Sequence, residues 1–367
     1  MAIALITVYC ASLTACAGSS VAQSELSSSQ INGAGATFPL PVYTEWTYMY
    51  KEVQPGISIN YQGIGSGGGK KGIIDRTIDF AGSDSLLSPE EYSAGEDLQM
   101  YPILAGAVVL IYNITFENYD PAHDPPLILD RQSLVDIYLG KIKNWNDPRI
   151  KTLNPKLEDK LPAKPITTVH RSDGSGTTEI FTTALSAFSP EWKETAGAAP
   201  AIEWPVDKAG GPGIGGRGNQ GVAGAVKNTP NSIGYVELSY ATSNNIPFIQ
   251  MINKAGQVVT ANAESLAAAM SDFENAFDER LTATIVDAPG ENSWPIAGYT
   301  YIILHTRSMT DCQKAEHLLA FLKWALTDPQ PARRAAELGY STLPDSVRDA
   351  VLTKLGEVTC NSVPVLP

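Results

Sequence analysis

Three stretches of the chain combine glycines with a hydroxyl residue just before a segment that is expected to be helical. They are residues 33–38 (GAGATF), 63–69 (GIGSGGG) and 173–178 (DGSGTT). A helix start exposes unpaired N–H groups and carries partial positive charge, and glycine lets the backbone approach a ligand closely. Three such starts that converge would surround an anion with donors without a large positive charge. The pattern therefore predicts an oxyanion site, although one such loop alone is more often only a tight turn.

Two charged residues sharpen this prediction. Arg171 immediately precedes the third loop, where its planar guanidinium can hold two ligand oxygens. Asp84 follows the short strand expected at 77–81, and a carboxylate beside a bound anion is unfavourable unless the anion carries a proton. Hydrogen phosphate carries one, whereas sulfate at neutral pH does not. Sites built on a required hydrogen bond reject analogues that lack it by roughly 10⁴–10⁵-fold, so Asp84 would select phosphate.

Each charged residue also has a plainer interpretation. Asp84, with Ser83, can cap a helix that starts near residues 88–91. Arg171 can form a surface ion pair with Asp173, or Asp173 can instead orient Arg171 toward a ligand.

Catalytic machinery is hard to find in the sequence. No histidine has the spacing of a metal-ligand motif, and no Gly-x-Ser-x-Gly elbow occurs. His170, beside Arg171, is a candidate phosphoryl acceptor, but a histidine at a strand end is far more often structural. Gly63-x-Gly65-x-x-Gly68 matches a dinucleotide fingerprint only formally. We therefore expect a binding protein with no catalytic residues, no metal and no cofactor, and not an enzyme.

The elements around these loops alternate between strand and helix. Strand–glycine loop–helix repeats indicate an α/β fold with a largely parallel sheet, in which ligands bind at the carboxyl ends of strands. A glycine-rich run at 210–216 is expected to be a loop outside any helix or strand interior. The expected strands are 57–61, 77–81, 102–111, 166–169 and 299–304, and the expected helices are 132–139, 265–276 and 312–327.

Length and composition bound the class of protein. The 367 residues suggest about two domains, and 43% hydrophobic with 18% charged residues is an ordinary globular composition. The net charge of −13 argues against nucleic acid and anionic membrane surfaces as partners. It does not argue against a small anion, because local dipoles set the affinity for such an ion.

The first residues read as a targeting segment. Residues 1–15 are apolar but too short to span a bilayer, and Leu13-Thr14-Ala15-Cys16 resembles a bacterial lipobox. We expect 1–15 to be a lipoprotein signal peptide, and 16–30 to be a flexible tether that starts at a lipidated Cys16. A plain secretory peptide is the alternative, and the apolar run lacks the usual preceding Lys or Arg.

Two cysteines remain if Cys10 leaves with the signal peptide and Cys16 carries the lipid. An even pair outside the cytosol predicts a Cys312–Cys360 disulfide that pins the C-terminal tail. Two unpaired thiols are the alternative.

From about residue 31 to 347 the chain resembles the phosphate-binding subunits of bacterial high-affinity phosphate (Pst) ABC transporters. This resemblance implies a type II periplasmic-binding-protein fold, with two α/β lobes joined by a two-segment hinge and phosphate in the cleft. It places lobe I at 31–105 and 296–367 and lobe II at 106–295. Its main markers are 33–39, 61–66, 79–84 and 171–177, with support from 136–142, 233–237 and 343–347.

The resemblance also implies a set of site residues, in which Asp84 accepts the phosphate proton and Asp173 supports Arg171. The sequence departs from the family at Gly67, where serine is common, at His170, where a basic residue is common, and in a long 210–216 loop. The implied phosphate contacts are Thr37, Phe38 (amide), Ser66, Asp84, Arg171, Ser175, Gly176 (amide) and Thr177.

Together these observations predict an extracytoplasmic, lipid-anchored solute-binding protein. It would capture inorganic phosphate between closing lobes and deliver it to ABC permease subunits driven by a cytoplasmic ATPase. We expect a monomer that touches the membrane only through its lipid. The alternatives are a binder of another tetrahedral oxyanion such as sulfate, molybdate or tungstate, a secreted phosphatase, and an adhesin or signalling protein that retains the fold.

Overall fold

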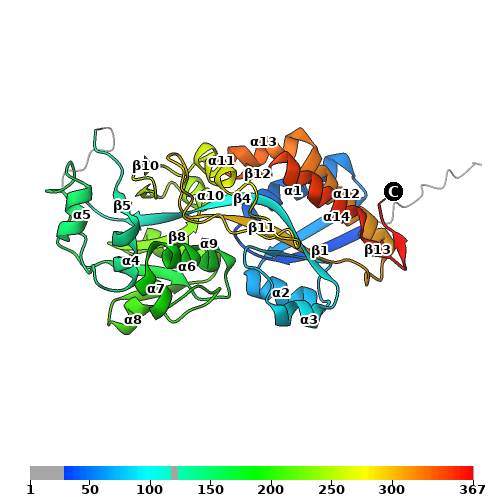
Figure 1. The fold of residues 1–367 in the computed structure, drawn as a ribbon, viewed down its shortest axis with the longest axis horizontal. Helices are drawn as coiled ribbons and strands as arrows, with labels where there is room; N and C mark the ends of the chain where they lie inside the picture. The colour runs from blue at the N-terminus through cyan, green and yellow to red at the C-terminus, as the bar shows by residue number, and fades with distance from the viewer. Residues whose placement is uncertain (1–28, 117–122, 367) are drawn as a thin grey trace, which may run out of the picture.

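The computed structural model describes residues 29–116 and 123–366, which form two lobes side by side (Figure 1). The predicted signal peptide, Cys16 and most of the predicted tether lie outside the described residues. The tether prediction is wrong at its last two residues, because strand β1 (Ser29–Gly35) already begins at Ser29. Ser29 and Gln30 pair in parallel with the start of strand β2 (Ile57–Gly63), so the sheet holds them.

The lobe that contains the N-terminal strand has a parallel core of β2, β1 and β3 (Phe80–Ser83). The expected strand at 77–81 starts later, because the Asp79 carboxylate accepts from the Asn32 backbone N–H and shapes a turn before Phe80. Helices α1, α12, α13 and α14 cover one face of this sheet, and α2 and α3 cover the other (Figure 1). Their bounds are α1 Leu40–Val53, α2 Ser66–Ile74, α3 Pro89–Gly95, α12 Cys312–Thr327, α13 Pro329–Glu337 and α14 Asp345–Gly356.

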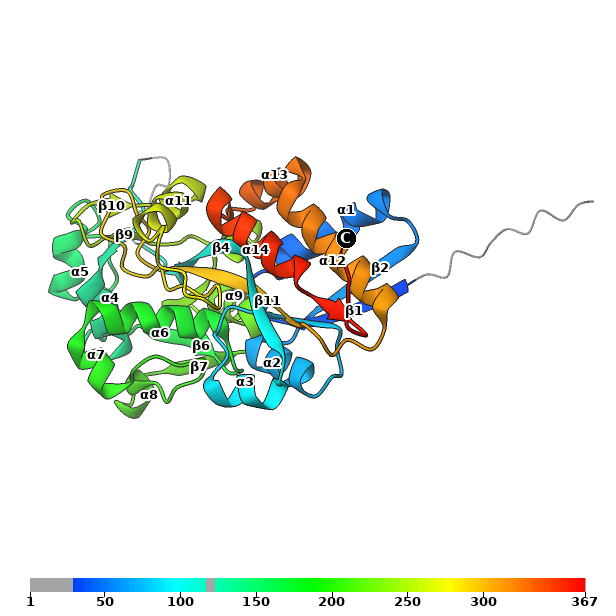
Figure 2. The ribbon, with the colours of Figure 1, turned by 45° about the vertical axis from the view of Figure 1, so that its right-hand side comes forward.

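Two long apolar strands connect the lobes. The first half of β4 (Leu98–Asn113) pairs antiparallel with β11 (Ala297–His305), and its second half pairs with β8 (Ser232–Glu237). Figure 2 shows β4 and β11 running side by side through the middle of the molecule. The sequence therefore located both strands, and the structure extends each one. Among the described residues, nine strands form one sheet in the order β2-β1-β3-β11-β4-β8-β6-β7, with β12 (Ser341–Thr342) also on β4.

The second lobe places β6 (Thr167–Arg171) between β8 and β7 (Gly213–Gly216), all three parallel. The expectation that the whole glycine run forms a loop is wrong for its second half, which is this edge strand. The backbone alone forms the pairing, and an added Cβ at Gly216 would lie 2.6 Å from Val222 N in helix α9 (Gly218–Asn228). Glycine is therefore needed where this strand meets the helix.

The remaining elements of the second lobe pack around this sheet and a small second sheet of β10, β9 and β5. Helix α11 ends four residues before the expected 276, because the chain turns at Phe273. The bounds are α4 Arg131–Tyr138, α5 Pro148–Leu153, α6 Gly176–Phe188, α7 Pro190–Thr195, α8 Pro205–Lys208, α10 Leu238–Ser243, α11 Ala263–Asp272, β5 Ile128–Asp130, β9 Gln250–Ile252 and β10 Val258–Val259.

The C-terminal tail is tied to the first lobe. Cys312, at the start of α12, forms a disulfide with Cys360, and their Cα atoms lie 5.4 Å apart. Cys360 belongs to a hairpin of β13 (Thr359–Cys360) and β14 (Val363–Pro364). The predicted pairing is therefore present in the structure. In the described part of the chain, no helix is long and apolar enough to cross a membrane.

Candidate oxyanion-binding site

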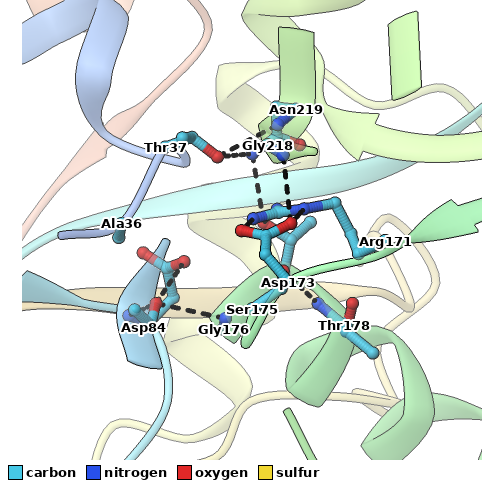
Figure 3. A network of polar contacts seen from close by, with 12 residues as sticks. Ala36, Thr37, Asp84, Arg171, Asp173, Ser175, Gly176, Thr178, Gly218 and Asn219 are labelled. Atoms are coloured by element: carbon cyan, nitrogen blue, oxygen red, sulfur yellow. Dashed lines mark hydrogen bonds and ion pairs between the residues drawn. The ribbon is translucent and has the colours of Figure 1, made fainter. Parts of the chain in front are cut away.

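The three glycine loops meet between the lobes. Thr37 and Phe38 lie between β1 and α1, Ser66 opens α2 directly after β2, and the third loop joins β6 to α6. All three loops follow the carboxyl ends of parallel strands, where α/β folds bind ligands. Figure 3 shows Thr37 and Asp84 from one lobe facing Arg171, Ser175 and Gly176 from the other. The predicted side chains that converge here are all at most 6% exposed, namely Thr37, Ser66, Asp84, Arg171, Ser175 and Thr177.

The second and third loops touch directly across the lobes. The Gly176 N–H donates to Ser66 Oγ at 3.1 Å, and the Gly67 N–H donates to the Gly174 carbonyl at 3.0 Å. An added Cβ at Gly176 would lie 2.5 Å from Asp84 Cβ. The glycines therefore permit the close approach of the two lobes that the structure shows, as well as the close approach of a ligand.

The first loop is oriented by two tyrosines. Tyr240 OH donates to the Thr37 carbonyl at 2.5 Å, and Tyr340 OH donates to the Phe38 carbonyl at 2.7 Å. In a trans peptide the C=O and N–H point in opposite directions, so the Phe38 N–H points away from Tyr240. This leaves the Phe38 amide free of that tyrosine and available to a ligand on the opposite side.

Arg171 is fixed by a bidentate pair with Asp173. Its Nε and Nη2 donate to the two carboxylate oxygens at 2.7 and 2.5 Å, and the Gly218 N–H donates to the same carboxylate at 3.0 Å. Burial acts to raise the pKa of Asp173, but the hydrogen bonds and charge of Arg171 outweigh it and lower that pKa. The Arg171 side chain is buried and that of Asp173 is only 13% exposed, so the surface ion-pair interpretation is wrong, and the geometry is compatible with the orienting role.

Asp84 holds a carboxyl group with an unusual proton affinity. Thr300 Oγ1, on β11, donates to its Oδ1 at 2.9 Å, and Ser66 Oγ lies 3.4 Å from its Oδ2. Burial raises the pKa of Asp84 to about 7, although these hydroxyls and the charge of Arg171 oppose the shift. A group that titrates near neutrality can exchange a proton with a ligand.

The helix-cap interpretation of Asp84 is wrong. Ser88, not Asp84, caps helix α3, because the Ser88 side chain accepts from the Glu91 N–H in a full capping box. Ser175 does have a capping role, since its Oγ accepts from the Thr178 N–H at the start of α6. That bond still leaves the Ser175 hydroxyl hydrogen free to donate to a ligand.

Sequence reasoning missed Asn219. This fully buried residue, in the first turn of α9, donates its backbone N–H and its Nδ2 to Thr37 Oγ1, each at 3.0 Å. Its Nδ2 also donates to Thr177 Oγ1 at 3.1 Å. A signal was present in the sequence, because residues 213–219 are rich in glycine and lead into a helix, as the other three loops do.

The other predicted groups near the site are structural. His170 stacks on Trp204 with ring centroids 5.0 Å apart, and its Nε2 lies 3.0 Å from Asp207 Oδ2. These contacts hold its ring, so nothing favours the phosphoryl-acceptor interpretation. In residues 29–116 and 123–366, no three His, Cys, Asp or Glu side chains gather as a metal ion would require.

The lobes are closed, so little open space remains at the site. A pocket of about 50 Å³ beside it is lined in part by Asp84 and Glu179. Larger hollows, of about 340 Å³ next to Lys314 and about 310 Å³ next to Gly211, lie elsewhere in the described residues. The converging donors, rather than cavity size, therefore identify the site.

Comparisons with known proteins agree with this picture. Residues 20–329 match the model of the PBP superfamily domain. The chain is 41% identical over 318 residues to the phosphate-binding protein PstS of Pasteurella multocida, covering 86% of this chain and 87% of that protein. It is 38% identical over 331 residues to PstS of Methanocaldococcus jannaschii, covering 86% of this chain and 83% of that protein.

Solved structures share the fold at lower sequence identity. One is a high-affinity periplasmic phosphate-binding protein, PfluDING, bound with phosphate, at 22% identity and a TM-score of 0.67 over 88% of this chain and 93% of that one. Another is a phosphate-binding protein from Stenotrophomonas maltophilia, at 21% identity and a TM-score of 0.62 over 89% and 93%. At these identities the likeness establishes the mixed α/β periplasmic-binding-protein fold.

Proposed function

The chain belongs to the PstS family of phosphate-binding proteins within the periplasmic-binding-protein superfamily, and on that premise we propose that it captures inorganic phosphate for import. It is an extracytoplasmic solute-binding protein of a phosphate ABC transporter and not an enzyme. One observation carries the proposal: three helix starts, one buried guanidinium and one buried carboxyl group of raised pKa converge between the two lobes.

We propose that phosphate lies among these groups. Three oxygens would accept from backbone N–H groups, hydroxyls and the Arg171 guanidinium, which are all donors. The protonated oxygen would face Asp84, which accepts the P–O–H hydrogen bond. The proposed contacts are Thr37, Phe38 (amide), Ser66, Asp84, Arg171, Ser175, Gly176 (amide) and Thr177.

The proposed lobes are 31–105 with 296–367, and 106–295, with β4 and β11 as the hinge segments. Ser66 and Gly176 lie on opposite sides of this division and are in contact in the closed molecule. A ligand that contacts both lobes favours the closed state by its differential affinity for that state. We therefore propose that phosphate binding and lobe closure are the same step.

The proposed mode of anchoring comes from the sequence at the N-terminus. We propose that Cys16 carries lipid and that the residues up to about 28 tether the binding domain to the membrane. The tethered protein would work as a monomer and would dock on permease subunits that a cytoplasmic ATPase drives.

Isothermal titration of a Cys16→Ala protein with phosphate, arsenate and sulfate tests the proposal. We expect one phosphate per chain and much weaker sulfate binding. Equal affinity for sulfate would contradict the role of Asp84, and binding of no oxyanion would favour an adhesin or signalling role. Release of nitrophenol from nitrophenyl phosphate would instead indicate a phosphatase.

A further inference from the structure

The site contains a residue whose contacts assign it a task beyond the proposed ligand set. We propose that Asn219 is a positioning residue that forces the hydroxyls of Thr37 and Thr177 to act as hydrogen-bond donors toward phosphate. The inference rests on the proposed phosphate function. It also makes Asn219 a link between lobe closure and the orientation of these two donors (Figure 3).

The Thr37 hydroxyl has both of its acceptor positions filled by Asn219. A hydroxyl has one O–H and two acceptor lone pairs. Thr37 Oγ1 accepts from both the backbone N–H and the Nδ2 of Asn219, each at 3.0 Å. Both lone pairs are then occupied, so the hydroxyl can make a further hydrogen bond only by donating its hydrogen.

Thr177 is held as a donor in the same way. Its Oγ1 accepts from Asn219 Nδ2 at 3.1 Å and from Arg171 Nη1 at 3.4 Å. A single amide nitrogen thus uses its two hydrogens on two hydroxyls, one from each lobe. Both hydroxyls are left as donors, which suits an ionised phosphate oxygen and offers no acceptor to the hydrogen of a P–O–H group.

The orientation of the Asn219 amide is itself determined. Its Oδ1 accepts from the Glu237 backbone N–H at 3.0 Å, and the side chain is fully buried. Exchanging the oxygen and nitrogen would place the NH₂ group against that N–H, donor against donor, while two hydroxyls could then donate to the oxygen. Only the observed orientation gives the Glu237 backbone N–H an acceptor and leaves both threonine hydroxyl hydrogens for the ligand.

Ser66 differs from the two threonines, because its hydroxyl hydrogen already has an acceptor in the closed structure. Its Oγ accepts from the Gly176 N–H at 3.1 Å and from the Asp84 N–H at 3.3 Å. Its one hydroxyl hydrogen donates to Asp84 Oδ2 at 3.4 Å. The hydroxyls of Thr37 and Thr177 are therefore the two that are held as donors toward a ligand, whereas Asp84 is the acceptor. This division orients the bound ion, because its protonated oxygen finds an acceptor only at Asp84.

Lobe opening separates Thr37 from Asn219, because the two residues lie on opposite lobes. Removing the Asn219 side chain should therefore act mainly on the closed, ligand-bound state. We expect Asn219→Ala to weaken phosphate affinity about 10- to 100-fold, the range for a lost hydrogen bond to a charged group. Most of the loss should appear as faster dissociation, measured by stopped-flow fluorescence with phosphate.

A double-mutant cycle separates positioning from a structural role. In a Thr37→Val, Thr177→Val background, Asn219→Ala should change phosphate affinity less than about twofold, because the hydroxyls that it orients are absent. An equal loss in both backgrounds would overturn the inference. Should Asn219→Ala fail to fold, the same cycle with Asn219→Ser decides between the two outcomes.

Two controls complete the experiment. Asn228→Ala removes an exposed asparagine at the far end of the same helix, whose Nδ2 donates to the Gly224 carbonyl, and it should leave phosphate affinity unchanged. The wild-type titration separates the two proposals. Failure of the wild type to bind phosphate refutes the proposed function, whereas wild-type binding with no coupling in the cycle refutes only the role of Asn219.

Discussion

At the scale of single residues, the site combines groups that oppose one another in charge. Arg171 is neutralised by the partly buried Asp173, and Asp84 adds a buried carboxyl group close to the proposed position of the anion. This balance suits a ligand that brings both negative charge and a proton. It makes Asp84 the residue whose replacement is most informative.

Asp84→Asn should reduce the discrimination between phosphate and sulfate. The amide can donate to a sulfate oxygen, whereas the carboxylate repels it, so the ratio of the two dissociation constants should fall at least about tenfold. Isothermal titration with both ions at pH 7 measures this ratio. An unchanged ratio would show that Asp84 does not sense the proton.

The same variant should change how the stability of the ligand-free protein depends on pH. The folded pKa of Asp84, about 7, lies above its ordinary value of 3.8, so the folded state binds the proton more tightly than the unfolded state. Below about pH 4 the Asp84 carboxyl is protonated in both states and does not affect the free energy of unfolding. Between about pH 4 and pH 7 the unfolded state ionises more readily, so the free energy of unfolding falls as the pH rises. Asp84→Asn should raise the free energy of unfolding at pH 8 by about 1–4 kcal/mol but not at pH 4. Urea unfolding of the variant and the wild type at pH 4 and pH 8 tests this, and an equal change in unfolding free energy at the two pH values would contradict it.

At the scale of elements, the sequence predicted the strands that are apolar along their length and the helices that have a clear hydrophobic periodicity. Strands β4 and β11 are apolar along nearly their whole length, and each of the three glycine loops predicted the start of a helix. The strand β7 was missed, because glycines carry no side-chain pattern and its pairing with β6 is made by the backbone. Asn219 was missed for the same reason, since it follows that strand.

Contacts between distant segments also lay beyond the sequence. Thr300 of β11 donates to Asp84, a residue 216 positions earlier in the chain, and no local pattern marks Thr300 as its partner. The resemblance to a known family supplied the remaining site residues, whereas spacing alone supplied only the glycine loops, Arg171 and Asp84. Local rules thus predict the loops, and the sheet order determines what they face.

The glycine at the start of α6 should be required for closure rather than for folding. In Gly176→Ala, the added methyl would lie 2.5 Å from Asp84 Cβ and 2.6 Å from Ser85 N, both on the opposite lobe. The lobes can relieve this clash by staying apart, so phosphate affinity should fall more than about 100-fold while the free energy of unfolding changes by less than about 1 kcal/mol.

Gly224→Ala is the matched control for Gly176→Ala. Gly224 lies inside helix α9, and nothing is within 4 Å of an added Cβ there. Alanine should stabilise the helix by about 0.5–1 kcal/mol and leave phosphate binding unchanged. Titration and urea unfolding of both variants test the assignment, which fails if Gly176→Ala binds phosphate as the wild type does.

At the scale of the whole molecule, the disulfide and the binding site lie apart. The bond joins residues 48 positions apart beside the C-terminal hairpin, away from the interlobe loops. A Cys312→Ser, Cys360→Ser protein should lose about 2–4 kcal/mol of unfolding free energy, because its unfolded chain is less constrained. Its phosphate affinity, measured by titration, should remain within about twofold of the wild type. A large loss of affinity would mean that the tail supports the site.

Closure itself can be followed at two backbone amides only two residues apart. The Gly67 N–H donates across the lobes to the Gly174 carbonyl, whereas the Gly65 N–H donates within one lobe to the Gly35 carbonyl. If phosphate holds the lobes together, hydrogen exchange at Gly67 should slow on phosphate addition, because that bond exists only in the closed state. Exchange at Gly65 should change far less, since its bond survives opening. Equal protection of Gly67 with and without phosphate would mean that the lobes stay closed without ligand, and that binding and closure are separate events.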